Sequence, residues 1–389
     1  MTRIVIVIPS YIKADNPKDC IESDGFKMLE RAMASLKSQK DFDVTVALPF
    51  CIEGKGMKEG RCAEYHSALM KALSANPFPF KRFVLTDHNF NIMKEGITKK
   101  GFYDIYLIKR LALCGFSNIR NSGLIISQAL NADVVVFIDN DEVVEDTNFL
   151  DIALEGLFEP INNKIMDGKG GFYISADEKL YERLPYQGWQ VFWNKSRLFK
   201  ELWEDIINTE GRFVESPVVL GGNLVITRRL FEKIPFDPLI PRGEDIDYLI
   251  NAKIANFNIL FDKMLRIKHL PKERAFSYRK EELKGDIERF LYEKEKVSNY
   301  KWLNLNPYPG YFIKWDIEIK ALITVILFSL RLILNKRWRD AVEVYGYLTP
   351  LFKKAKDRGY YEDFKLRWTD LMVFIKHNNL NDLLREGFL

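Results

Sequence analysis

Residues 131–142 read N-A-D-V-V-V-F-I-D-N-D-E, and the fold that the sequence predicts follows from this stretch. Residues 134–138 form an unbroken apolar run rich in β-branched side chains, which is typical of a strand buried on both faces of a parallel sheet. Asp139 and Asp141 follow directly. Ligands of open α/β sheets bind outside the carboxyl ends of the strands, so both carboxylates are predicted at a binding site. The alternative is a strand end with an acidic turn, in which Asp139 caps a helix.

Asp139 and Asp141 are two positions apart, so on an extended chain they can face the same way. Carboxylate oxygens are hard ligands that suit Mg²⁺ or Mn²⁺, and these ions commonly bridge to a substrate phosphate. The pattern therefore predicts a divalent-metal site at this end of the strand.

The chain on either side alternates between short β-branched runs and segments of helical periodicity. Strands are predicted at residues 4–8, 44–48, 82–86, 172–175, 217–219, 224–226, 259–261 and 264–267. Helices are predicted at residues 25–37, 63–75, 117–130 (with Ser117 as N-cap) and 244–253, and longer amphipathic helices at 311–334, 338–353 and 366–384. The alternation predicts an α/β fold with a mostly parallel sheet flanked by helices, followed by an α-helical C-terminal appendage.

Size and composition restrict the class of protein. With 389 residues the chain exceeds the length at which one core stops growing, which favours one large domain plus an appendage. Lys and Arg (58) nearly balance Asp and Glu (54), which argues against a nucleic-acid partner. The apolar runs at residues 4–8 and 321–334 are too short for a signal peptide and a spanning helix, so we expect a cytoplasmic protein, peripheral to the membrane at most.

The four cysteines (Cys20, Cys51, Cys62 and Cys114) contain no C-x-x-C pair. We expect free thiols in a reducing compartment.

Five short motifs follow one another in order. They are Pro9-Ser10-Tyr11, Arg120-Asn121 at a helix start, Asp139-Asn140-Asp141, Gly222-Asn223, and Gly243-Glu244-Asp245 followed by His269. Together, over roughly residues 3–271, they resemble the nucleotide-sugar glycosyltransferases of the GT-A fold, particularly the large family-2-like group. Each motif is weak alone, and their order and spacing make the resemblance specific.

The resemblance implies a Rossmann-like GT-A catalytic domain at residues 1–271, with a nucleotide-binding half (1–142), an acceptor-binding half (143–271) and a helical region at 272–389. It implies a donor site that contains Pro9, Ser10, Tyr11, Arg120, Asn121, Asp139, Asn140, Gly222 and Asn223. It also implies a Mg²⁺ or Mn²⁺ site of Asp139, Asp141 and His269, with Asp141 as a direct ligand.

Asp245 matches the residue that acts as general base in inverting members of this group, and Glu244 would hold a hydroxyl of the donor or acceptor. Some relatives of similar plan are retaining enzymes that need no such base. The second strand of the family normally ends in an acidic residue that holds the nucleotide base, whereas here it ends in Leu48-Pro49-Phe50; Asp87, after the third strand, is the expected substitute. Trp189 is the expected acceptor-stacking residue, unless it belongs to the core.

The resulting hypothesis is a metal-dependent transferase that moves a mannose- or glucose-type hexose from a GDP- or UDP-linked sugar to a small polar acceptor, as in compatible-solute synthesis. The alternatives are transfer to a lipid-linked or polysaccharide acceptor at the membrane surface, and a non-catalytic nucleotide-sugar-binding protein.

In the helical tail an apolar stripe recurs on one side of the predicted helix at residues 312, 319, 323, 326, 330 and 334. We expect this stripe to be buried against protein, in the monomer or in a homodimer formed through the helical C-terminal region, rather than in lipid.

Overall fold

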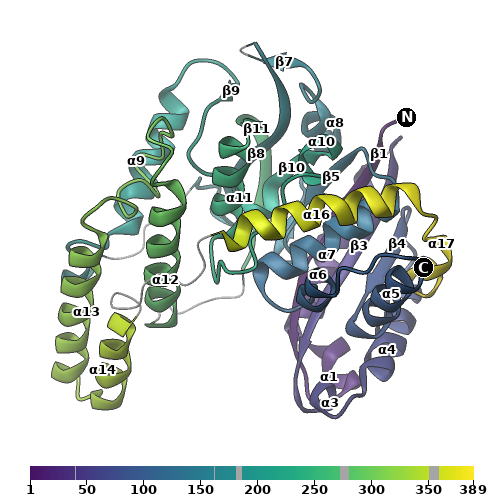
Figure 1. Ribbon diagram of the computed structural model, residues 1–389, viewed down its shortest axis with the longest axis horizontal. Coiled ribbons are helices and arrows are strands. Elements are labelled where there is room, and N and C mark those ends of the chain that lie inside the picture. The colour runs from purple at the N-terminus through teal and green to yellow at the C-terminus, as the bar shows by residue number, and fades with distance from the viewer. Residues whose placement is uncertain (40, 162, 181–185, 272–279, 350–358) are drawn as a thin grey trace.

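The computed structural model describes residues 1–389 except residues 40, 162, 181–185, 272–279 and 350–358. The described residues form a mixed sheet of eleven strands (Figure 1). The strands are β1 (Arg3–Val7), β2 (Ser10–Lys13), β3 (Asp43–Glu53), β4 (Lys81–Leu85), β5 (Val134–Phe137), β6 (Glu142–Val143), β7 (Pro160–Ile161), β8 (Lys164–Ile174), β9 (Phe213–Val214), β10 (Leu224–Thr227) and β11 (Asn258–His269).

The sheet has a parallel N-terminal part and a mixed C-terminal part. Strands β4, β3, β1 and β5 lie side by side and are parallel. Strand β10 is antiparallel to both β5 and β8, and β8 is parallel to β11. The short strand β6, which begins three residues after Asp139, pairs with the end of β11 through Glu142 and His269. This pairing brings two predicted site segments together.

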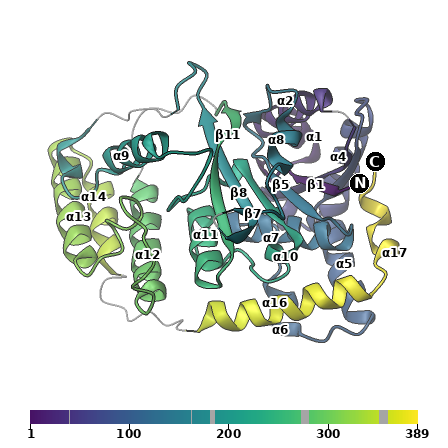
Figure 2. The same ribbon diagram turned by 90° about the horizontal axis from the view of Figure 1, so that it is seen from above.

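Helices cover both faces of the sheet, and a further group extends beyond one end of it (Figure 2). They are α1 (Pro17–Glu22), α2 (Asp24–Ser35), α3 (Lys55–Lys58), α4 (Cys62–Ser74), α5 (Asp87–Lys99), α6 (Ile105–Arg110), α7 (Phe116–Ala129), α8 (Phe149–Leu154), α9 (Lys195–Asn208), α10 (Arg228–Phe231), α11 (Glu244–Ile254), α12 (Lys280–Val297), α13 (Ile317–Leu334), α14 (Trp338–Tyr345), α16 (Tyr360–His377) and α17 (Asn381–Leu384). Five 3₁₀ turns lie at Leu36–Ser38, Gly188–Gln190, Gly221–Asn223, Gly346–Leu348 and Arg385–Gly387.

Side chains that point alternately to the two faces of the central strands form the two main hydrophobic cores. In β1, Ile4 and Ile6 belong to one core and Val5 and Val7 to the other, because successive side chains of a strand point to opposite faces. A third core lies around Trp193 and joins α9, α12, α13 and α14. This aromatic-rich core also contains Phe172 of β8 and Phe261 of β11, so it joins the helical appendage to the sheet.

Helix α16 departs from the other C-terminal helices and lies along α7, as both views show. The buried Trp368 indole donates to Phe231 O (2.9 Å), and the Gln128 side chain of α7 donates to Met372 O (2.9 Å). The last residues continue to the edge of the sheet, where Leu389 N–H donates to Arg82 O of β4 (3.0 Å). The edge strand β4 is thereby partly covered.

The predicted α/β architecture, a mostly parallel central sheet flanked by helices with a helical C-terminal region, is confirmed. Two details of the prediction were wrong. Residues 217–219 form no strand, because the Ser216 side chain accepts Val218 N–H (3.1 Å) and donates to Val218 O (2.7 Å), the groups that a ladder would use. Residues 259–267 belong to one strand, β11, with a register shift between Phe261 and Arg266. Of the helix expected at 338–353, α14 covers the first part, and residues 350–353 lie outside the described residues.

The expected burial of the apolar stripe is confirmed for Phe312, which is fully buried, but is wrong in the monomer for most of its members on α13. Ile319, Ile326, Leu330 and Leu334 are exposed, and the opposite face packs inward through residues that include Ala321, Val325, Phe328 and Leu332. Within the described part of the chain, no helix is long and apolar enough to cross a membrane.

Candidate active site

Arg120 joins three distant segments of the chain at the carboxyl end of β5. Helix α7 begins after Gly115, whose φ of 99° suits glycine, and not after the expected cap Ser117. One turn later, the 5% exposed Arg120 side chain donates to Asp139 Oδ1, Glu244 Oε1 and Gly221 O, each at 2.9 Å. Burial alone lowers the pKa of Arg120, but attraction to Asp139 and Glu244 outweighs it and raises the pKa. Arg120 therefore stays a cation that fixes both carboxylates.

Asp245 lies beside this cluster at the start of α11. The helix is entered through Gly243 in a left-handed conformation (φ 74°). Asp245 Oδ2 accepts Gly221 N–H (2.9 Å), and Oδ1 accepts Ile246 N–H (2.8 Å). Burial and then repulsion from Glu244 outweigh the attraction to cations and raise the pKa of Asp245 to about 6. A carboxylate with a pKa near neutrality is suited to general-base work.

Arg289 was not predicted as a site residue, because it belongs to the helical tail. This buried side chain of α12 pairs with Glu293 (2.7 Å) and presses against Gly243, where an added Cβ would lie 1.8 Å from Arg289 Nη1. It is one of the cations that lower the pKa of Asp245. The tail thus shapes the turn that carries Glu244 and Asp245, and no local sequence signal pointed to this.

Asp141 and His269 meet, as their expected role requires. His269 Nε2 lies 3.4 Å from Asp141 Oδ2, and the imidazole stacks on Tyr173 with ring centroids 5.0 Å apart. A carboxylate beside an imidazole is a donor set that suits Mn²⁺ or a similar divalent ion. Asp139 instead faces Arg120, and among the described residues the ligand atoms of the three predicted ligands do not all lie within 4.8 Å of one another. The Asp141–His269 pair fits a metal, and Asp139 would have to leave Arg120 to join it.

Glu142 and Tyr173 also belong to the candidate site, because they contact Asp139 and Gly222. The buried Glu142 carboxylate accepts Asp139 N–H (2.7 Å), and burial followed by repulsion from Asp139 raises its pKa well above the usual range. The hydroxyl oxygen (Oη) of Tyr173 accepts Gly222 N–H (2.7 Å). A Cβ on Gly222 would lie 2.2 Å from the Glu142 carboxylate, so only glycine fits there. Glu142 could have been found from the sequence as the third acid after the strand; Tyr173 had no such signal.

The side-chain amides of three predicted donor-binding asparagines form hydrogen bonds with the backbone. Asn121 donates to Phe236 O and accepts Phe236 N–H, both at 2.8 Å. The fully buried Asn223 donates to Phe172 O (3.1 Å) and Leu265 O (3.3 Å). Asn140 donates to Gly25 O (3.2 Å). Both amide groups of Asn121 are thus used by the backbone, whereas Asn140 and Asn223 use only their N–H₂ groups, and Asn223 Oδ1 is buried without a hydrogen-bond partner among the described residues.

A pocket of about 880 Å³ opens where β3 and β4 end. Strand β3 runs beyond residue 48 to Glu53, so it ends in an acid after all, and Glu53 lines the pocket with Asp87. Burial raises the pKa of Asp87, which Lys94 partly offsets. Burial and a hydrogen bond to Glu53 raise the pKa of Tyr11 to about 12. Asp87 thus lies at a cavity of ligand size, whereas Tyr11 does not line it and is connected to it only through Glu53.

Pro9 and Ser10 lie beside this region, in the turn into β2. Ser10 is fully buried, with its hydroxyl 3.5 Å from Ile8 O, while Pro9 is half-buried. Ser10 therefore has little surface to offer a donor.

Trp189 belongs to the core of the appendage, which contradicts its expected role in acceptor stacking. It is only 3% exposed, its indole stacks on Phe328 of α13 (4.4 Å between centroids), and its N–H donates to Gln187 Oε1 (2.7 Å). An aromatic segment distant in sequence covers it.

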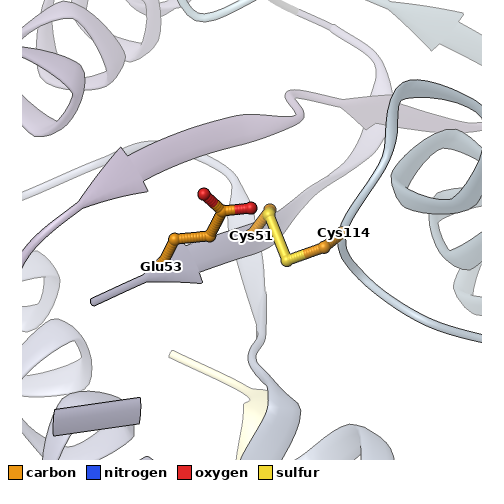
Figure 3. A group of neighbouring side chains, drawn as sticks. All are labelled: Cys51, Glu53 and Cys114. Carbon is orange, nitrogen blue, oxygen red and sulfur yellow. A yellow bond between two sulfur atoms is a disulfide. The ribbon is translucent and has the colours of Figure 1, made fainter. Parts of the chain in front are cut away.

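The expectation of four free thiols is wrong for two of them. Cys51 of β3 and Cys114, just before α7, form a disulfide with Glu53 beside it (Figure 3). Among the described residues these three side chains are the one group of potential metal-ligand atoms that all lie within 4.8 Å. The pair joins residues 63 apart, so spacing alone did not reveal it. Cys20 and Cys62 are free.

No family model matches this sequence, and no curated protein sequence matches it. A solved mannosyltransferase from Pyrobaculum calidifontis, in complex with GDP-Man and Mn²⁺, is 12% identical, covers 98% of this chain and 87% of its own, and has a TM-score of 0.43. Glucosyl-3-phosphoglycerate synthase from Mycobacterium tuberculosis, in complex with Mn²⁺, UDP-Glc and phosphoglyceric acid, is 16% identical over 76% of this chain and 79% of its own, with a TM-score of 0.38. At these TM-scores neither likeness carries an argument about function, which is drawn below from this chain's own residues.

Proposed function

We propose that the protein is a metal-dependent GT-A glycosyltransferase that moves a mannose- or glucose-type hexose from a GDP- or UDP-linked sugar to an acceptor hydroxyl, with inversion. The observation that carries this proposal is the Arg120 cluster, which joins Asp139 to Glu244, 105 positions further along the chain (244 − 139 = 105). Buried, paired charges at the carboxyl end of a parallel strand are typical of a site for a charged substrate.

The chemistry requires charge compensation at the leaving diphosphate. Asp141 and His269 would hold a divalent ion, which Asp139 could join only by leaving Arg120, and such an ion offsets the negative charge that develops there. The sequence placed Arg120 in the donor site, where its charge would meet the donor phosphates. We propose a different role for it. Its charge is already matched by Asp139 and Glu244, so it positions these carboxylates rather than meeting the phosphates itself.

Asp245 is the proposed general base. Two backbone N–H groups fix its carboxylate and favour the ionised form. It takes the proton of the acceptor hydroxyl while that oxygen attacks the anomeric carbon and the diphosphate leaves from the opposite face. Glu244, held by Arg120, would bind a sugar hydroxyl. We propose that the nucleoside binds in the pocket lined by Glu53 and Asp87, since carboxylates accept hydrogen bonds from base N–H groups.

The role of Asp245 is tested by Asp245→Asn. We expect nucleotide binding to persist and transfer to fall about 10²–10⁴-fold, the usual contribution of a general base. The matched control is Asp151→Asn on the exposed side of α8, which should leave transfer unchanged. NMR of the fresh product then reports stereochemistry. An α-linked product from an α-linked donor would mean retention and would remove Asp245 from the role of base.

The metal site is tested without catalysis, by thermal shift with GDP or UDP and with or without Mn²⁺. A ligand that binds the folded chain raises its melting temperature by mass action, so we expect one nucleotide to stabilise the protein only with Mn²⁺. His269→Ala should remove this metal-dependent shift, whereas His377→Ala on α16 should retain it. A shift equally large in His269→Ala would return His269 to a structural role.

A further inference from the structure

Helix α13 turns a continuous apolar face away from the protein. The exposed large side chains recur every three or four residues, the spacing of one face of a helix. They are Trp315, Ile319, Leu322, Ile326, Leu330 and Leu334, of which Trp315 is 80% and Leu334 84% exposed. Burial of the opposite face through Phe328 and Leu332 fixes this orientation, so the exposed face is not a consequence of a loosely placed helix.

The next helix continues the pattern. In α14 the exposed large apolar residues are Trp338, Val342 (75% exposed) and Tyr345, again at helical spacing, while Ala341 and Val344 pack inward. Helices α13 and α14 lie side by side at the end of the molecule opposite α5 (Figures 1 and 2). We call these nine exposed side chains the hairpin surface. Exposed apolar patches of this kind mark a protein or membrane contact.

The charges around the hairpin surface are mostly positive. The four acidic residues within residues 315–345 each form an ion pair: Asp316 with Lys320, Glu318 with Lys294, and Asp340 and Glu343 with Lys280. In contrast, Lys314, Lys336 and Arg339 are exposed and make no ion pair with any described residue. Two of these lie beside the tryptophans: Lys314 precedes Trp315 and Arg339 follows Trp338. The apolar surface therefore carries a basic rim next to its aromatic ends.

We propose that the hairpin surface docks on the face of a lipid bilayer that contains anionic headgroups. Tryptophan and tyrosine favour the headgroup level, apolar side chains enter the acyl boundary, and Lys and Arg meet anionic lipids. A second copy of the chain fits less well, because a symmetric contact brings the same basic rim to both sides of the interface. No described helix can span a membrane, so the contact lies on the surface. This inference does not depend on the glycosyltransferase proposal.

The test is co-sedimentation of the purified full chain with vesicles of phosphatidylcholine alone and of phosphatidylcholine mixed with phosphatidylglycerol. We expect clear binding to the anionic vesicles, weaker binding to the neutral ones, and a decrease with added salt. The variant Leu334→Ser/Trp338→Ser/Val342→Ser should reduce anionic binding at least tenfold. Its melting temperature should not change, because all three side chains are exposed.

The matched control is Leu366→Ser/Val373→Ser, which removes exposed apolar side chains from α16 and should bind vesicles like the parent chain. Absence of vesicle binding by the parent chain, or equal binding by the hairpin variant, overturns the proposal. Light scattering separates the remaining alternative: a dimer that the hairpin variant abolishes, without vesicle binding, would show that a second copy covers this surface. Loss of vesicle binding in Asp245→Asn would contradict the independence of docking from catalysis.

Discussion

The carboxyl end of β5 and the hairpin surface depart from the usual distribution of side chains in opposite directions. At β5, Arg120, Asp139 and Glu244 place charge in the interior, where an unpaired ion is costly. On α13 and α14, large apolar side chains face outward, where they gain nothing from the fold. The first departure is stabilised by its hydrogen bonds, whereas the second has no such compensation among the described residues. We propose that each is explained by a ligand or surface that it binds.

The largest expected effect comes from breaking the charged region. Arg120→Met leaves the buried Glu244 and the partly buried Asp139 without their cation, so we expect the free energy of unfolding to fall by about 3 kcal/mol and transfer to be lost. Urea unfolding measures the first and a transfer assay the second. Arg385→Met, at an exposed arginine, is the control and should change stability by less than about 0.5 kcal/mol. Wild-type stability in Arg120→Met would mean that the cluster is not held by charge pairing.

The second-largest expected effect concerns the disulfide between Cys51 and Cys114. The Cys51–Cys114 disulfide closes a loop of 63 residues, and loop-closure entropy predicts that its loss lowers the free energy of unfolding by about 4 kcal/mol. Cys51→Ser/Cys114→Ser, compared with wild type by urea unfolding, measures this. Cys62→Ser is the control, since Cys62 forms no disulfide. If dithiol reductant weakened the double variant as much as the wild type, the effect would not come from this bond.

The third effect contrasts the two faces of α13. Phe328→Ala removes a buried ring that stacks on Trp189 and should lower the free energy of unfolding by about 3 kcal/mol. Leu330→Ala, two residues on but exposed, should change it by less than about 0.5 kcal/mol. Equal losses in the two variants would show that the outer face is covered within the folded chain, and would remove the contrast with the charged site.

The smallest effect is the pH dependence of transfer. The proposed base, Asp245, must be ionised, and its pKa is raised to about 6. Activity should therefore be full above this pH and fall about tenfold for each further unit below it. The profile of kcat/KM against pH tests this. An acid limb near the usual aspartate range would show that the burial of Asp245 does not govern its ionisation during turnover.

Much of the sheet and of the charged site could be predicted from sequence, because strand ends of a parallel sheet meet at one edge whatever lies between them. That rule placed Asp139 and Asp141 correctly at the edge, and the structure brings Arg120 and His269 to them. The amides of Asn121 and Asn223 could not be assigned, since a polar residue near a strand end can serve the backbone as well as a ligand. Trp189 is covered by Phe328, 139 positions away (328 − 189 = 139), which no local pattern encodes. Helix α13 is apolar on nearly every side, so periodicity could not select its buried face.

The pairing of Leu389 with Arg82 has a consequence for the behaviour of the protein at high concentration. Strand β4 is the outer strand of the parallel sheet, and an open strand edge is a template on which another chain can add. Leu389 exchanges hydrogen bonds with Arg82 in both directions, and Phe388 packs edge-on against Phe83. Deleting residues 385–389 would uncover this edge without touching the site, and aggregation, rather than lost activity, would be the first symptom.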